Sequence, residues 1–177
     1  MTKIFQDETF NEVRYDGDDD DCIGGIIEFC EYNNCKFVGV NFSGTNFVSS
    51  KFNDCIFDEC IFFNSKISGE CNFSGCFFSG CDFKEGVVLK SLFFDCDFIV
   101  CDFRSRRFEA TSFQDCKVVS CSFVSVIMRQ SMFTGGSFRD SDVTDIFVDN
   151  VSRTLFSGVS VNPKDIVGYY NMEIKKR

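Results

Sequence analysis

Phenylalanine recurs every five residues over most of this chain of 177 residues. Counting from Phe37 to Val148, this position occurs 23 times in succession, with one residue inserted after Ile67. Phe occupies 17 of these places, and Ile, Val or Met occupies the other six. A helix would need a period of 3.6 residues and a plain strand a period of 2, so neither explains the pattern. A period of five places every repeat in the same environment only when the chain turns a corner at each repeat.

Four such corners close a square coil of 20 residues, and coils stacked about 4.8 Å apart form a solenoid. The repeat therefore predicts about six coils and a rod roughly 30 Å long. In an extended segment, the residue two before each Phe points the same way as the Phe. Nearly all residues at that place are small, so a small and a large side chain fill a narrow core together.

Stacking every fourth repeat brings like residues into columns. Nine of the 12 Cys fall into two columns on neighbouring sides, where each stands beside a Phe. We expect a core of stacked Phe and Cys from Phe37, Phe57, Phe78 and Phe98 with Cys35, Cys55, Cys76, Cys96 and Cys116, and from Phe42, Phe62, Phe83, Phe103 and Phe123 with Cys60, Cys81, Cys101 and Cys121.

Units such as CNFSG (71–75), CDFKE (81–85) and CDFRS (101–105) resemble the pentapeptide-repeat family. The pattern of that family is a small residue, Asp or Asn, Leu or Phe, and two variable residues. The resemblance covers about residues 22–148. It implies an all-β fold, a right-handed quadrilateral parallel β-helix.

The chain divides into three predicted segments. Residues 1–21 form an acidic N-terminal leader or cap, and residues 22–161 form the β-helix, with an irregular stretch near 149–154. Residues 162–177 form a short C-terminal capping helix and a basic tail, because Asn-Pro at 162–163 is a typical helix start. Phe5, Phe10 and Tyr15 keep the five-residue spacing, so the leader is expected to begin as a capping strand. The acidic run Asp18–Asp21 is expected to be a solvated loop.

Two irregularities interrupt the repeat. The inserted residue near Gly69 and Glu70 predicts a small bulge at a corner. Arg106 stands at a small, inward position, where a charged group without a partner is costly to bury. We therefore expect a local distortion that turns Arg106 outward. It would join Arg104, Arg107 and Arg129 in a basic patch that is a candidate interaction site.

Several classes of function are disfavoured by composition. The chain contains no His, so no Ser-His-Asp triad and no His-ligated zinc site can form from it. The net charge of −9 argues against direct nucleic-acid binding. Residues 1–35 hold ten acids and two bases, and the remaining residues hold 17 acids and 16 bases. The acidity thus belongs to the leader. We expect no enzyme, no cofactor and no metal.

The chain has no signal peptide and no membrane-spanning apolar run, so a cytoplasmic location with reduced thiols is expected. The leading interpretation is a non-enzymatic scaffold that binds an unidentified protein partner. The resemblance also implies an alternative, a mimic of DNA that binds type II topoisomerases such as DNA gyrase and confers quinolone resistance. Such proteins are usually homodimers joined through C-terminal helices. A third interpretation is thiol redox or metal sensing through the Cys columns.

Overall fold

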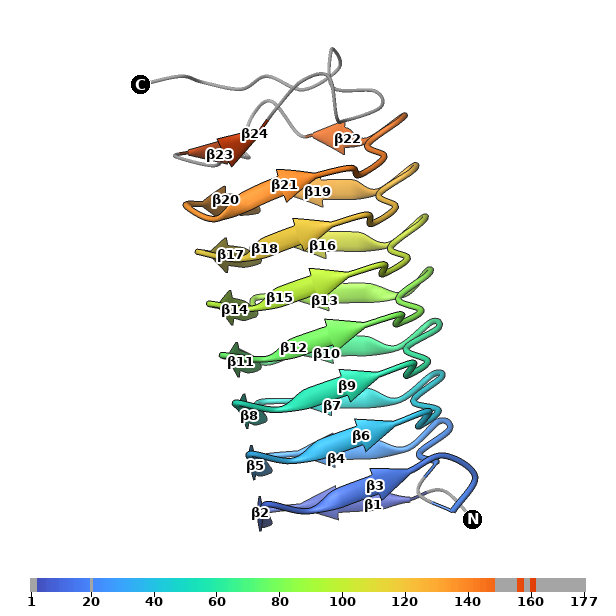
Figure 1. Cartoon of the computed structure of the whole chain (residues 1–177). Coiled ribbons are helices and arrows are strands. Elements are labelled where there is room, and N and C mark those ends of the chain that lie inside the picture. Colours follow the sequence, from blue (N-terminus) through green and yellow to red (C-terminus); the bar gives the residue numbers. More distant parts are fainter. Residues whose placement is uncertain (1–2, 20, 149–155, 158–159, 162–177) are drawn as a thin grey trace.

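The five-residue period folds into a stack of four-sided coils, as Figure 1 shows. A computed structural model describes residues 3–19, 21–148, 156–157 and 160–161. Three sides of the rod are parallel sheets of eight strands each. The fourth side is joined by single bridges in the order Asn41, Ile61, Asp82, Asp102, Ser122 and Asp142. All regular elements of these residues are strands, so the predicted parallel β-helix is confirmed.

Each strand spans two or three residues, and successive strands go to successive sides. Sheet 1 contains β1 Ile4–Gln6, β4 Ile26–Glu28, β7 Asn46–Val48, β10 Lys66–Ser68, β13 Val87–Leu89, β16 Arg107–Glu109, β19 Ile127–Arg129 and β22 Phe147–Val148. Sheet 2 contains β2 Thr9–Asn11, β5 Glu31–Asn33, β8 Lys51–Asn53, β11 Asn72–Ser74, β14 Leu92–Phe94, β17 Ser112–Gln114, β20 Met132–Thr134 and β23 Phe156–Ser157. Sheet 3 contains β3 Arg14–Asp16, β6 Lys36–Val38, β9 Ile56–Asp58, β12 Phe77–Ser79, β15 Asp97–Ile99, β18 Lys117–Val119, β21 Ser137–Arg139 and β24 Ser160–Val161.

The Phe columns form the core, as predicted. Along one column, Phe57 stacks on Phe37 with ring centroids 4.7 Å apart and planes 4° apart. Phe78 continues that stack at 4.8 Å. Between neighbouring sides the rings meet edge to face, as Phe52 and Phe57 do at 62°. Both geometries are favourable for aromatic pairs, so one residue type serves all four sides.

The small inward residues do more than fill space. Each thiol in the Cys columns approaches the carbonyl oxygen of a core residue in the coil before it. Cys96 Sγ lies 3.4 Å from the oxygen of Phe73, and Cys101 Sγ lies 3.5 Å from that of Phe78. Thr111 makes the same contact through its hydroxyl, 3.2 Å from the oxygen of Val88. The inward position therefore favours a small residue that carries a weak donor.

The inserted residue lies at a corner, as predicted. Strand β10 pairs with β13 at an offset of 21 residues, since Lys66 faces Val87. Strand β11 pairs with β14 at the regular offset of 20, since Asn72 faces Leu92. The extra residue is thus absorbed between Ser68 and Asn72, and the repeat above it is undisturbed.

The rod has about seven turns, one more than the repeat count predicts. The acidic leader supplies the additional turn, because β1, β2 and β3 pair in register with β4, β5 and β6. At the other end, Phe156 faces Phe133 and Val161 faces Phe138. The predicted irregular stretch at 149–154 and the predicted helix at 162–177 lie outside the described residues. The described part of the chain contains no helix with the length and apolar character needed to cross a membrane.

Candidate interaction face

Over four successive coils, the outward side chains of sheet 2 carry no charge. Along β11, β14, β17 and β20 these residues, which we call the neutral face, are Asn72, Ser74, Leu92, Phe94, Ser112, Gln114, Met132 and Thr134. In the same span, the outward residues of sheet 1 include four charged side chains and those of sheet 3 include three. The fourth side carries Asp82, Lys84, Asp102, Arg104 and Asp142. The neutral face is therefore distinct from the other three sides.

The neutral face presents large apolar side chains to solvent. Phe94 is 42% exposed and Met132 is 36% exposed. Leu92, on the same strand as Phe94, is half-buried. Protein interfaces have centres that lack charge and are enriched in aromatic residues and Met, surrounded by polar rims. The corners on either side supply such a rim, with exposed Lys90 on one and exposed Asp95 on the other.

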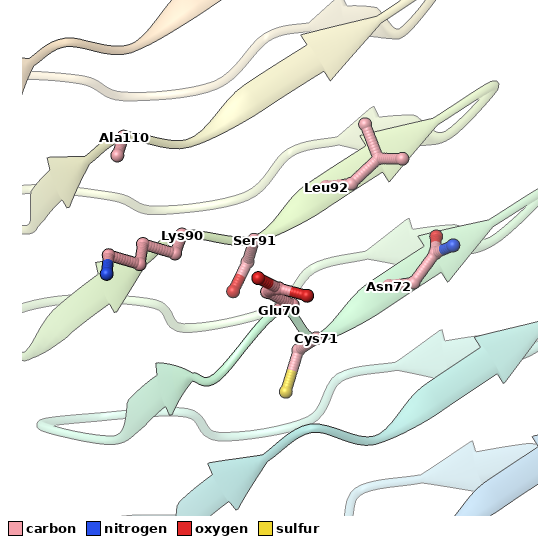
Figure 2. Close-up of a pocket in the computed structure, with 7 residues that line it drawn as sticks. All are labelled: Glu70, Cys71, Asn72, Lys90, Ser91, Leu92 and Ala110. Atoms are coloured by element: carbon pink, nitrogen blue, oxygen red, sulfur yellow. The ribbon is translucent and has the colours of Figure 1, made fainter.

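A hollow of about 580 Å³ opens at the corner between sheets 1 and 2, next to the neutral face (Figure 2). It is lined by Glu70, Cys71, Asn72, Lys90, Ser91, Leu92 and Ala110. The insertion lies at this corner, where Gly69 and Glu70 stand in the place that Ser49 or Lys90 fills alone in neighbouring coils. Gly69 and Glu70 both have a positive φ, of 70° and 67° respectively. The hollow is thus local to the one irregular corner of the repeat body.

The bulge is held by its neighbour in the coil before it. The Ser49 hydroxyl donates to the carbonyl oxygen of Gly69 over 2.7 Å. A Cβ on Gly69 would overlap Ser49 Oγ, so the close approach requires glycine there. At the edge of the hollow, Asn72 Oδ1 is buried, and no donor among the described residues reaches it. This corner therefore contains a buried acceptor that has no donor within the described residues.

The predicted arginine patch is divided between two sides of the rod and lacks Arg106. Arg104 lies on the fourth side and pairs with Asp102 at 2.6 Å. Arg107 lies on sheet 1 and approaches Glu109 at 3.5 Å, and Arg129 is exposed on the same sheet. Arg104 and Arg107 are close in sequence but lie on different sides of a corner, whereas Arg107 and Arg129 lie on neighbouring strands of sheet 1.

The prediction that Arg106 turns outward is wrong. Its side chain is completely buried and points along the core toward earlier coils. Burial lowers the pKa of the guanidinium to about 9, an effect that the charge of Asp82 opposes. The guanidinium is tolerated in the core because backbone oxygens accept its hydrogen bonds. The expected local distortion is present, but it makes room for the buried Arg106 side chain and does not turn that side chain outward.

The acidic residues of the fourth side are largely paired within their own coils. Asp82 forms an ion pair with Lys84 at 2.9 Å, and Asp102 pairs with Arg104. The Arg104 guanidinium holds the pKa of Asp102 below its ordinary value, although partial burial opposes this. Each of these carboxylates also accepts the backbone N–H two residues later, as turn-forming Asp residues do. These Asp side chains therefore have a structural role in the corner.

All twelve thiols are free and buried. Burial raises the pKa of thiols such as Cys22, Cys71 and Cys81, which keeps them protonated at neutral pH. Among the described residues, no three Cys, Asp or Glu side chains are grouped as metal ligands. The burial of the Cys columns supports a structural role for their thiols.

The family model described as pentapeptide repeats (8 copies) matches residues 33–62. These residues include six of the regular Phe positions, and the structure shows the same unit from Phe37 to Phe138, interrupted by the one inserted residue. The chain is built of pentapeptide repeats. No curated protein matches the sequence of this pentapeptide-repeat protein.

Solved structures of the same repeat type align with most of the chain. HetL of the cyanobacterium Nostoc sp. strain PCC 7120, involved in heterocyst differentiation regulation, aligns at 10% identity and a TM-score of 0.47, over 93% of this chain and 86% of HetL. QnrB1, a plasmid-mediated fluoroquinolone resistance protein, aligns at 17% identity and a TM-score of 0.34, over 92% of this chain and 95% of its own. Rfr23 of the cyanobacterium Cyanothece 51142 aligns at 6% identity and a TM-score of 0.43, over 92% and 90% of the two chains.

The neutral face was missed in the sequence analysis. The signal lies in the residues that flank Phe73, Phe93, Phe113 and Phe133, none of which is charged. It becomes visible only when the flanking residues are sorted by side, as the core residues were. The hollow could not be found in this way, because the sequence places the insertion but does not say which way the bulge opens.

Proposed function

We propose that this pentapeptide-repeat protein is a non-enzymatic scaffold that binds a partner protein through the neutral face. The main support for this proposal is the difference in outward charge between the sides of the rod over four successive coils. Sheet 2 has no outward charge there, whereas every other side has at least three charged residues. A face without charge loses little solvation when it is covered, which makes it the least costly side to bury.

The partner surface that fits this side is uncharged and apolar at its centre. Phe94 and Met132 would provide the apolar contact, because exposed aromatic and Met side chains contribute strongly at interfaces. The hollow at the inserted corner would then give the partner a fixed place along the rod.

The test compares two charge substitutions on opposite sides of the rod. Phe94→Glu places a charge on the neutral face, and Phe63→Glu places one on the fourth side, where Phe63 is 39% exposed. Partners captured by cross-linking are identified by mass spectrometry, and each is then titrated with the purified variants. We expect Phe94→Glu to weaken binding at least tenfold, a loss typical of a central interface residue. Phe63→Glu should leave the affinity unchanged.

A different outcome would refute this proposal. If both variants bind a reconstituted partner equally well, or if Phe63→Glu alone loses binding, the neutral face is not the docking side. Circular dichroism and melting temperature of both variants establish that each remains folded. Because the two Phe residues are similarly exposed, a general loss of stability would affect both alike.

The structure favours the scaffold over a mimic of DNA. A mimic presents unpaired negative charge in place of phosphates. In the Asp column of the fourth side, Asp82 and Asp102 are neutralised by Lys84 and Arg104. Outside residues 1–35, acids and bases are nearly equal in number. We therefore do not propose topoisomerase binding.

We also propose that the protein works in a reducing, cytoplasmic compartment. Its core uses twelve unpaired thiols as donors and fillers. An oxidising compartment would favour disulfides wherever partial unfolding brought two thiols together. Fractionation of cells that express the tagged protein tests the location.

A further inference from the structure

Arg106 reaches into two earlier coils of the rod. Its Nη1 donates to the backbone oxygens of Phe83 at 2.9 Å, Glu85 at 3.1 Å and Phe62 at 3.2 Å. Its Nη2 donates to the backbone oxygen of Ser65 at 3.2 Å and to the Ser65 hydroxyl at 3.1 Å. By contrast, the thiol contacts of Cys96 and Cys101 reach back only 23 residues. In solenoids each repeat ordinarily contacts only its neighbours, so a link to the coil beyond the neighbour is exceptional.

The bond to Phe83 replaces a turn bond that the other coils make internally. At the corner between the fourth side and sheet 1, the amide of the small residue donates to the carbonyl oxygen three residues earlier. Examples are Ser65 to Phe62 at 3.1 Å and Arg106 to Phe103 at 3.1 Å. In the coil between them, the described backbone bonds include none from Gly86 to Phe83. The turn at residues 83–86 is therefore completed by a side chain from the next coil.

Gly86 makes room for this side chain. It occupies the small position directly below Arg106 and has a positive φ of 70°. A Cβ there would overlap the backbone oxygen of Ser65, one of the acceptors of the guanidinium. The guanidinium carbon also lies 5.6 Å from the centre of the Phe83 ring, within the range of a cation–π contact. The pocket for the cation thus depends on one glycine at one height of the rod.

The residues that Arg106 joins lie on both sides of the insertion. Phe62 and Ser65 precede the extra residue at 69–70, and Phe83 and Glu85 follow it. Above and below this point the units are nearly alike, so a shift of the upper coils by one unit would keep most Phe in the core. A shifted Arg106 would meet a Cys or Ser side chain instead of Gly86, and its charge would lack acceptors. Such a mismatch is costly, because a buried charge needs hydrogen-bond partners.

We propose that Arg106 acts as a pin that fixes the register of the coils across the insertion, with Gly86 and the backbone oxygens of residues 62–65 and 83–85 as its socket. It is a conformational device of the fold, independent of the neutral face. A single buried cation can specify register in a structure that is otherwise repetitive, as buried polar residues do in some coiled coils.

The first test measures local protection. Arg106→Met keeps the length of the side chain but removes its donors. We expect hydrogen exchange of the amides in residues 62–66 and 83–87 to accelerate about tenfold, the loss typical of a hydrogen bond to a charged group. Val126→Ala is the matched control, because Val126 is the buried residue of the same column one coil higher. It should lower stability without changing exchange at these two corners relative to the rest of the rod.

The second test reads the register itself. Lys66 and Val87 are partners across the insertion, so cysteines placed there by Lys66→Cys and Val87→Cys lie side by side in the native register. After refolding, a short bifunctional thiol reagent should link positions 66 and 87 almost completely when Arg106 is present. With Arg106→Met the yield of that link should fall several-fold. An unchanged yield together with unchanged exchange would overturn the proposal.

A rescue experiment covers the case in which Arg106→Met does not fold. Arg106→Gly leaves the socket empty, and millimolar methylguanidinium supplies the missing cation at a concentration too low to denature. We expect its melting temperature to rise with methylguanidinium, whereas that of Val126→Gly should not. Equal responses of the two variants would mean that the socket does not recognise a guanidinium, and the pin would be refuted.

Discussion

The contact between Cys96 Sγ and the carbonyl oxygen of Phe73 shows what the inward position requires of a residue. The same contact recurs at Cys76, where Sγ lies 3.2 Å from the oxygen of Phe52. Ser50 meets the oxygen of Ile27 through its hydroxyl at 3.3 Å. A thiol fills more space than a hydroxyl and costs less to bury, so Cys is well suited to columns flanked by Phe.

Two substitutions of Cys96 distinguish the contribution of its volume to stability from the contribution of its hydrogen-bond donor. Cys96→Ala removes both, and we expect the free energy of unfolding to fall by about 1–2 kcal/mol. Cys96→Ser keeps a donor, as Ser50 does in its own column, and should cost less than Cys96→Ala. Urea unfolding of the two variants measures the difference. If Cys96→Ala were as stable as the wild type, the contact would have no energetic value.

The raised pKa values of the buried thiols predict how the stability of the protein depends on pH. Burial raises the pKa of Cys22, Cys30 and Cys71 above the ordinary value of 9.0. Above pH 9 the unfolded chain therefore releases protons that the folded chain keeps, so stability that is fully present below pH 9 is lost as the pH rises. Each such thiol can contribute a slope of about 1.4 kcal/mol per pH unit.

The measurement is the urea midpoint between pH 7 and 10.5 in the presence of a reductant. We expect a plateau up to about pH 8.5 and a steady decline beyond it. Arg106 acts in the opposite direction, because its pKa is lowered to about 9 by burial, but it is one group against several thiols. A midpoint that stays constant to pH 10.5 would contradict the prediction.

At the scale of the strand and its corner, the repeat depends on a left-handed residue at each turn. Asp54, Asp95 and Asp115 hold this conformation at one corner, with φ between 51° and 55°. Asp and Asn tolerate it, and Gly adopts it without strain. Among the described non-glycine residues with positive φ, Val100 is the one that is β-branched. Its φ is 55°, and it is 61% exposed.

Val100→Gly should therefore stabilise the protein. The variant loses little packing, because the side chain is exposed, and it relieves the strain of a β-branched residue at positive φ. The extra flexibility of glycine in the unfolded chain offsets part of the gain, so we expect a net increase of about 0.5–1 kcal/mol. Thermal and urea unfolding measure it. Ala110→Gly is the control, since Ala110 has a φ of 50° without β-branching and should gain less.

At the scale of the whole molecule, the two ends differ from the middle. Strands β1, β2 and β3 are the last of their sheets, so one edge of each has no partner among the described residues. Exposed acids surround this end, among them Asp7, Glu8 and Glu12. Charged residues at open edges oppose pairing with another chain. The acidity of the leader therefore lies at the end of the rod, beside these open strand edges.

The order in which the thiols react with a reagent should depend on how far their coils lie from the N-terminal end of the rod. Coils at the N-terminal end have a neighbour on one side only, so they open more easily than those in the middle. We expect a thiol reagent to modify Cys22 and Cys30 first and Cys76 and Cys96 only on global unfolding. Mass spectrometry after timed alkylation of the native protein gives the order. Rapid reaction of the central thiols would instead support redox sensing through the Cys columns.

The repeat determined the fold and the core because its information is local. A Phe at every fifth position, with a small residue two before it, defines the corners, the coil length and the core columns without reference to any long-range contact. The stacked rings of Phe37, Phe57 and Phe78 follow from this pattern. The place of the inserted residue was equally readable. Only the tertiary structure decided the orientation of Arg106, because that depends on carbonyl oxygens 23 and 41 residues earlier in the chain and on the space above Gly86. The neutral face and the hollow beside it arise in the same way, from residues that come together only when the coils are stacked.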